Sequence, residues 1–70
     1  MKVGDQIIIA ARKQAEGEIE VHKTNIMVYQ TMPAGIGEHS DITEAVIEEL
    51  NKLAEANDRL EMIDKYFHSE

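Results

Sequence analysis

The sequence has little of several residue types on which small domains often depend. Among its 70 residues there is no cysteine, which excludes a disulfide framework and a thiolate metal site. Tyr29, Tyr66 and Phe67 are the only aromatic residues, too few for a platform that stacks nucleic-acid bases. The longest apolar run, residues 7–11, is far too short to span a membrane. A signal-peptide pattern is also missing at the N-terminus, so we expect a cytoplasmic protein.

Basic residues are scarce as well. Seven Lys and Arg stand against fourteen Asp and Glu, which gives a net charge of −7. This balance opposes binding to nucleic acid and anionic lipid, because a cationic surface supplies the attraction to both. Hydrophobic residues make up 43% of the chain, too many for a disordered segment. A chain of this size is marginally stable alone, and oligomerisation is a common remedy.

Proline and glycine are few and gather at one place. Pro33 is the only proline, and Gly35 and Gly37 follow it closely. Proline ends helices because it lacks an amide hydrogen and restricts the residue before it. The segments on both sides have helical periodicity. We therefore predict an all-α antiparallel helical hairpin: one domain over 1–70, with a helix over about 6–31, a bend over 32–40 and a helix over about 41–67.

Particular residues indicate where each helix begins and where the first helix could be interrupted. Asp5 is the predicted N-cap of the first helix, and Ser40 or Asp41 that of the second. Gly17 is a weak point, since glycine costs about 1 kcal/mol relative to alanine inside a helix. The apolar stripe keeps its phase across Gly17, which favours one continuous helix. The competing interpretation is a strand over 19–29, where β-branched residues are frequent.

Apolar residues recur every three or four positions in both segments, the spacing of one helix face. Two helices cannot enclose such a core, because each stripe is covered on one side only. Ile7, Ile47 and Met62 widen the stripes beyond what a single pair needs. We therefore predict a dimeric four-helix bundle, with a second copy of the chain as the main partner. The predicted core of this oligomer consists of Ile8, Ala15, Ile19, Ile26, Tyr29, Ile42, Val46, Leu53, Leu60, Ile63 and Phe67.

Three polar residues interrupt the stripes. Glu18 and His22 lie one turn apart on the first helix, and Glu49 lies between Val46 and Leu53 on the second. A bend centred near residue 36 places His22 level with Glu49, and a buried carboxylate requires a partner. One interpretation is a structural pair that fixes the register. The other is a metal site made by Glu18, His22 and Glu49, although the usual Glu-x-x-His spacing is missing.

Three blocks of the chain carry a resemblance. They are His22 to Asn25 with Tyr29, the turn Pro33 to His39, and Leu60 to Phe67. Together they resemble short uncharacterised proteins of marine tailed phages and marine metagenomes. The resemblance implies a viral or environmental origin and a location in a host cell or a virion. It implies no activity and no catalytic residues.

Three classes of function follow. The first is a nonenzymatic, self-associating protein-interaction module that binds a host or phage protein through its acidic outer face, or serves as a virion component. The second is a metal-binding four-helix bundle that uses Glu18, His22 and Glu49. The third is a small nucleic-acid modulator built as a helical-hairpin dimer, an analogy at the level of fold alone. We expect no enzyme and no cofactor, because the chain offers no nucleophile with a base and an orienting group.

Overall fold

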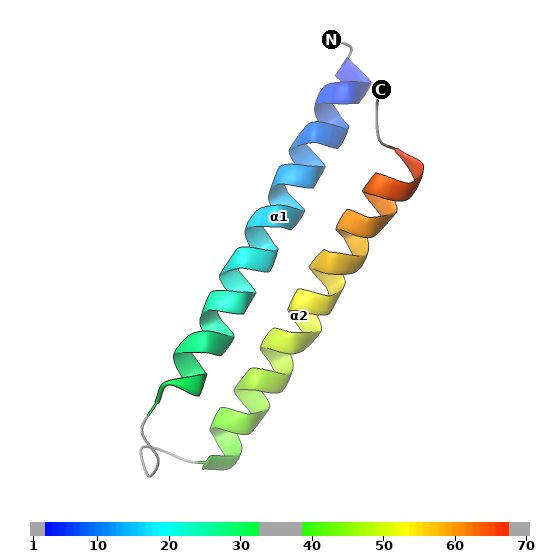
Figure 1. The fold of residues 1–70 in the computed structure, drawn as a ribbon. Coiled ribbons are helices and arrows are strands. Elements are labelled where there is room, and N and C mark those ends of the chain that lie inside the picture. Colours follow the sequence, from blue (N-terminus) through cyan, green and yellow to red (C-terminus); the bar gives the residue numbers. More distant parts are fainter. Residues whose placement is uncertain (1–2, 33–38, 68–70) are drawn as a thin grey trace.

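The computed structural model describes residues 3–32 and 39–67, and the side chains of residues 39 and 40 are not described. Two helices make up this part of the chain, α1 (Val3–Gln30) and α2 (His39–Tyr66). They lie side by side and run in opposite directions, so that the start of α1 and the end of α2 are at the same end of the molecule (Figure 1). The predicted all-α hairpin is confirmed.

α1 is continuous from Val3 to Gln30 and passes through Gly17 without a break. The strand considered for residues 19–29 is therefore wrong, and the described residues are helical over that whole range. Once a helix has been nucleated, each further residue adds a hydrogen bond, so one glycine within a long helix is tolerated. The phase of the apolar stripe was the better guide here.

Both helices begin earlier than predicted. α1 begins at Val3 and α2 at His39, so Asp5 and Asp41 lie inside the first turns and not at the N-caps. Acidic side chains in a first turn still interact favourably with the positive end of the helix dipole. Valine and glycine are poor helix formers, but intrinsic propensity is easily outweighed when a stable helix extends through them. Most of the predicted bend, residues 33–38, lies outside the described residues.

The C-terminal ends agree with the prediction within one residue. After Gln30, the amide of Thr31 donates to the carbonyl oxygens of Met27 and Val28, both at 3.2 Å. The Thr31 hydroxyl also donates to the Val28 carbonyl, at 2.9 Å. These bonds use carbonyl groups that a helix end otherwise leaves without partners. At the end of α2, the Phe67 amide donates to the Ile63 carbonyl at 2.9 Å.

The core between the two helices is thin. Ala15, Ala56 and Ile63 are the only buried hydrophobic residues in the described part of the chain. Phe67, which was predicted to lie in the core, is 58% exposed at the end of the hairpin. The other predicted core residues are half-buried: Ile8, Ile19, Ile26, Tyr29, Ile42, Val46, Leu53 and Leu60.

The shape explains the thin core. The molecule measures 53 × 16 × 14 Å, and its radius of gyration is 16.1 Å, against about 11 Å for a compact domain of this length. Its accessible surface is 5430 Å², whereas a compact monomer of 7.9 kDa exposes about 4,400 Å². The hairpin therefore keeps about 1,000 Å² more surface in water than a globular chain of the same mass.

Neither of the described helices is long and apolar enough to cross a membrane.

Candidate functional site

A polar cluster of three side chains crosses the helix pair at mid-length. His22 Nδ1 lies 2.7 Å from Glu49 Oε1, and the Asn25 amide donates to the same oxygen at 3.0 Å. The side chains of His22 and Glu49 are 17% and 16% exposed, so both are largely removed from water. The contact between His22 and Glu49, expected from the antiparallel register, is confirmed.

Helix periodicity explains why this cluster forms. His22 and Asn25 are three residues apart and so share one face of α1, towards α2. The hydrogen bond from Asn25, together with that from His22, lowers the pKa of Glu49 below its usual value, while desolvation opposes the change. Glu49 therefore stays ionised and accepts both hydrogen bonds at neutral pH.

Two further polar contacts join the helices. Arg59 donates to Glu18 at 2.8 Å, and Arg12 forms an ion pair with Asp64. The Arg59 hydrogen bond lowers the pKa of Glu18, with smaller contributions from Gln14 and His22. Both ion pairs are partly exposed, so each adds little stability by itself.

The polar contacts define the register of the hairpin. As the α1 member moves along the chain from Arg12 to Glu18 to His22, its α2 partner moves back from Asp64 to Arg59 to Glu49. A shift of one turn would separate these pairs and leave the half-buried Glu49 without donors. An unsatisfied polar group away from water is costly, and the cluster therefore opposes such a shift.

The residues predicted to bind a metal are not gathered into one site. His22 and Glu49 meet, but Glu18 is held by Arg59 and Gln14. Within residues 3–32 and 39–67, no group of three or more His, Asp or Glu side chains is placed to hold a metal ion. Of the two interpretations, the arrangement within one hairpin matches the structural pair.

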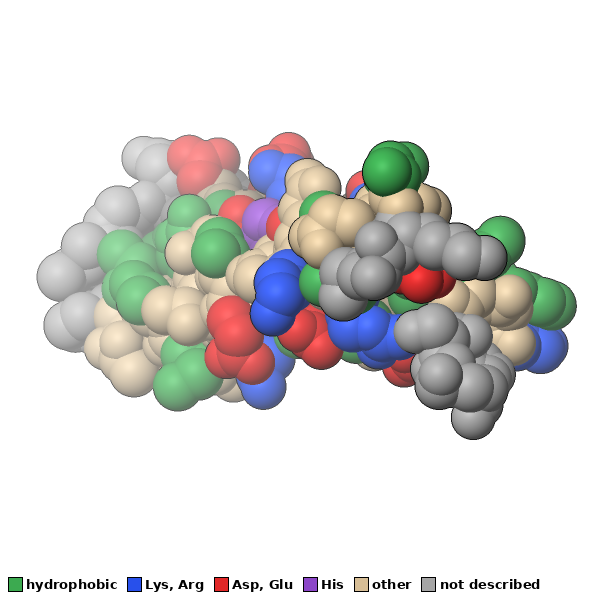
Figure 2. Space-filling model, turned by 90° about the horizontal axis from the view of Figure 1, so that it is seen from above, with side chains coloured by type: hydrophobic (Ala, Val, Ile, Leu, Met, Phe, Trp, Pro, Cys, Tyr) green, Lys and Arg blue, Asp and Glu red, His purple; other side chains and the backbone are tan. Residues whose placement is uncertain are grey.

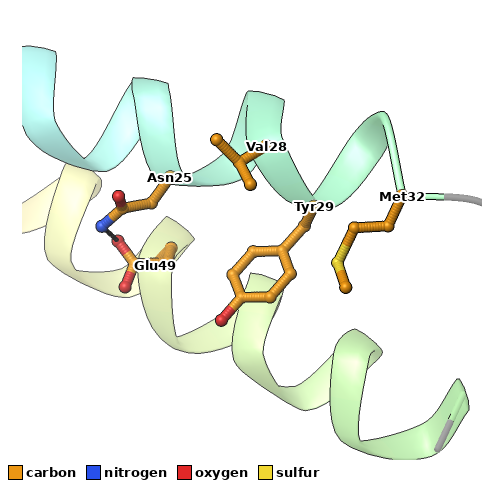
Figure 3. A pocket seen from close by; sticks show the side chains of 5 residues that line it. All are labelled: Asn25, Val28, Tyr29, Met32 and Glu49. Atoms are coloured by element: carbon orange, nitrogen blue, oxygen red, sulfur yellow. Dashed lines mark hydrogen bonds between the residues drawn. The ribbon is translucent and has the colours of Figure 1, made fainter. Parts of the chain in front are cut away.

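A shallow groove of about 380 Å³ adjoins the polar cluster. Figure 3 shows its lining, with Glu49 on α2 and four side chains from the last turns of α1 and the residues just after it. Asn25, Val28 and Tyr29 lie on α1, and Met32 follows its end. The groove is thus polar at one end and apolar at the other. Its lining has two titratable groups, the Glu49 carboxylate and the Tyr29 phenol.

The second notable feature is exposed apolar surface. Figure 2 shows hydrophobic side chains on the outside of the molecule, between acidic and basic ones. Ile7, Ile47 and Met62, predicted to widen the stripes, are all exposed by more than a third. Other large apolar side chains exposed to a similar degree are Val3, Val21, Met27, Val28, Met32, Leu50, Tyr66 and Phe67.

Sequence reasoning missed the roles of three residues. Arg59 follows Glu55 by four residues on α2, the spacing of an ion pair within one helix, but it reaches across to Glu18. Arg12 and Asp64 lie at the edges of the stripes. Counting along both helices from the His22–Glu49 contact, away from the bend, would predict that they meet. Asn25 follows His22 by three residues, and that spacing was the available signal.

Comparisons with protein-family models, with curated proteins and with solved structures each found no match to the chain. The resemblance to marine phage proteins therefore stays a prediction.

Proposed function

We propose that this protein is a nonenzymatic, self-associating protein-interaction module, in which two hairpins pair as a dimeric four-helix bundle. The observation that carries the proposal is the ratio of hidden to exposed apolar side chains. Three apolar residues are buried in the described chain, while eleven large ones are exposed by more than a third. Association with a second copy would remove part of these exposed side chains from water.

The amount of excess surface suits a dimer. The hairpin exposes about 1,000 Å² more than a compact chain of its mass. A stable protein–protein interface buries about 800 Å² on each partner. Association of two hairpins would therefore bring the exposed surface of each chain near that of an ordinary globular protein.

The outer surface suits a protein partner with a basic patch. Acidic residues outnumber basic ones by two to one, and several cations are already engaged: Arg12 with Asp64, Arg59 with Glu18, and Lys23 with Glu20 at 3.8 Å. This pairing leaves little cationic surface for nucleic acid. An excess of acidic side chains attracts basic surfaces and speeds their encounter.

In this proposal the polar cluster has a structural role. Glu49, His22 and Asn25 hold the two helices in one register, and a fixed register keeps the exposed apolar side chains in a constant pattern. A single buried polar contact that specifies alignment is the best documented use of such groups in helical assemblies.

Thermal unfolding at several protein concentrations tests the proposal. If folding is coupled to association, Tm rises with protein concentration by mass action. A range of protein concentration of roughly a hundredfold makes this rise measurable. A cooperative transition whose Tm is independent of concentration would refute self-association. For the outer surface, a protein captured from the producing cell by the wild type should be lost with the double variant Glu48→Lys/Glu55→Lys, which reverses two exposed charges.

A further inference from the structure

One flank of α1 carries a line of eight uncharged residues that runs the length of the helix. Successive members are alternately four and three residues apart, which is the heptad spacing of helices that pack along a seam. All eight are exposed and none is charged, although 30% of the residues in the whole chain are charged. This set, called the α1 seam below, consists of Val3, Ile7, Ala10, Gln14, Gly17, Val21, Thr24 and Val28.

We infer that the α1 seam binds the α1 seam of a second copy in antiparallel orientation, with Gly17 beside the two-fold axis. The inference rests on the proposed self-association and specifies which surface performs it. None of the eight residues belongs to the core predicted for the four-helix bundle, so the contact is made by a different flank of α1 from the stripe that packs against α2. An antiparallel pair about a two-fold axis is a closed, isologous interface, so it stops at the dimer.

Gly17 is the first observation in favour. A Cβ built on it meets nothing within 4 Å, so the hairpin itself gives no reason for glycine in the middle of a long helix. A glycine at a helix contact lets another backbone approach closely. Small residues recur at every seventh position around it, with Ala10 before it and Thr24 after it. The centre of the seam is therefore shaped for a close neighbour that one hairpin lacks.

The residues that border the seam decide its orientation. Lys13 and Glu20 lie beside it, seven residues apart, and both are exposed. Reversing the helix about Gly17 brings Lys13 of one copy within one residue of the level of Glu20 of the other, twice in each dimer. A parallel pair would instead place like charges at matching levels, which is destabilising. Charge complementarity therefore favours the antiparallel arrangement.

The seam also complements itself in shape. The reversed alignment places Ala10 opposite Thr24 and Ile7 within one residue of the level of Val28, so that small residues meet small ones and large meet large. It brings Gln14 of the second copy towards a hollow of about 290 Å³ on the surface of α1. That hollow is lined by Glu20, Val21, Thr24 and Asn25.

Cysteine cross-linking tests the alignment, because the natural chain has no cysteine to interfere. The single variants Ala10→Cys and Thr24→Cys are allowed to exchange subunits and are then oxidised gently, both separately and mixed. Disulfides form only between residues whose Cα atoms lie within about 7 Å. The antiparallel seam predicts a disulfide in the mixture, identified by mass as one chain of each kind, and little in either variant alone. Glu16→Cys, on the opposite flank, is the control and should not cross-link efficiently.

A pair of lysine substitutions tests the surface independently. Val28 lies on the seam and is 57% exposed, while Met62 lies on α2, off the seam, and is 44% exposed. Val28→Lys should weaken dimerisation by about tenfold or more, since it places a charge in a contact that excludes water. Met62→Lys should change the dissociation constant by less than about twofold, as expected of an exposed site outside the contact. Because both side chains are exposed, circular dichroism should show the hairpin retained in both variants.

The outcomes separate the inference from the proposal beneath it. Cross-linking of each cysteine variant with itself would overturn the antiparallel arrangement. A wild type that still dimerises, with no cross-link in any sample and equal effects of the two lysines, would overturn the α1 seam as the contact and leave self-association standing. Growth beyond the dimer would also overturn it and would point to a contact of the α1 seam with Ile47 and Leu50 of α2. A wild type that is monomeric would overturn both.

Discussion

The substitution Gly17→Ala separates the stability of the hairpin from the strength of its self-association. In a helix interior, alanine is favoured over glycine by about 0.8–1.0 kcal/mol. The added methyl group meets nothing within 4 Å of the hairpin, so no clash opposes this gain. For a domain of this size, such a gain raises Tm by roughly 4–8 °C. The isolated hairpin should therefore become more stable.

The dimer should respond in the opposite direction. If Gly17 lies beside the two-fold axis, the substitution inserts two methyl groups at the point of closest approach. Overpacking of this kind costs about 1–3 kcal/mol, and 1.4 kcal/mol corresponds to a tenfold change in a dissociation constant. We therefore expect dimerisation to weaken by about tenfold.

Two measurements are needed, urea unfolding by circular dichroism at a concentration where the chain is monomeric, and the dissociation constant by light scattering on dilution. Gly4→Ala is the matched control, because Gly4 is also in α1 with open space around it but lies off the seam. It should leave dimerisation unchanged. A stabilised monomer with an unchanged dissociation constant for Gly17→Ala would refute the close approach, and a destabilised monomer would refute the continuous helix.

Three other changes test the hairpin. The pKa of Glu49 is lowered in the fold, so its ionised carboxylate adds to the free energy of unfolding above the ordinary value of 4.5. That stabilisation is lost as the pH falls through the lower pKa of the folded state. In urea unfolding, the advantage of the wild type over Glu49→Gln should therefore shrink on acidification. Ile63→Ala, at a 6% exposed side chain, should cost about 2–3 kcal/mol in the same assay. Ala56→Leu, at a fully buried alanine, should cost about 1–3 kcal/mol through overpacking.

Neighbouring positions supply the controls for these changes. Met62→Ala and Ala54→Leu alter exposed residues next to Ile63 and Ala56 and should change stability by less than about 0.5 kcal/mol. Equal costs at buried and exposed positions would contradict the described interface. A stability difference for Glu49→Gln that grows on acidification would contradict the direction of its pKa.

The fold was largely predictable from the sequence because its pattern is simple. One proline with two glycines beside it separates two segments of helical period, and the distance of His22 and Glu49 from that bend predicted that the two side chains would meet. The helix starts were harder to predict. Asp5 and Asp41 are typical capping residues, but each helix extends two residues or more beyond them. An N-cap side chain contributes only about 1 kcal/mol, and helix ends vary by one or two residues, so a capping residue alone does not fix where a helix begins.

The polar contacts were predictable only where register alone determines them. The long side chain of Arg59 can turn along α2 to Glu55 or across to Glu18, and the structure has the second contact. Either contact is an exposed ion pair of small free energy, so the sequence does not show which one forms. The apolar stripes predicted which residues face the other helix. They did not predict that Phe67 lies just after the end of α2, where it is 58% exposed.

Sedimentation equilibrium of the wild-type chain at micromolar concentration tests self-association most directly. A self-associating chain has a mass of twice 7.9 kDa that falls towards the single value on dilution. A mass of 7.9 kDa at every concentration, from a chain that remains helical and unfolds cooperatively, would contradict self-association.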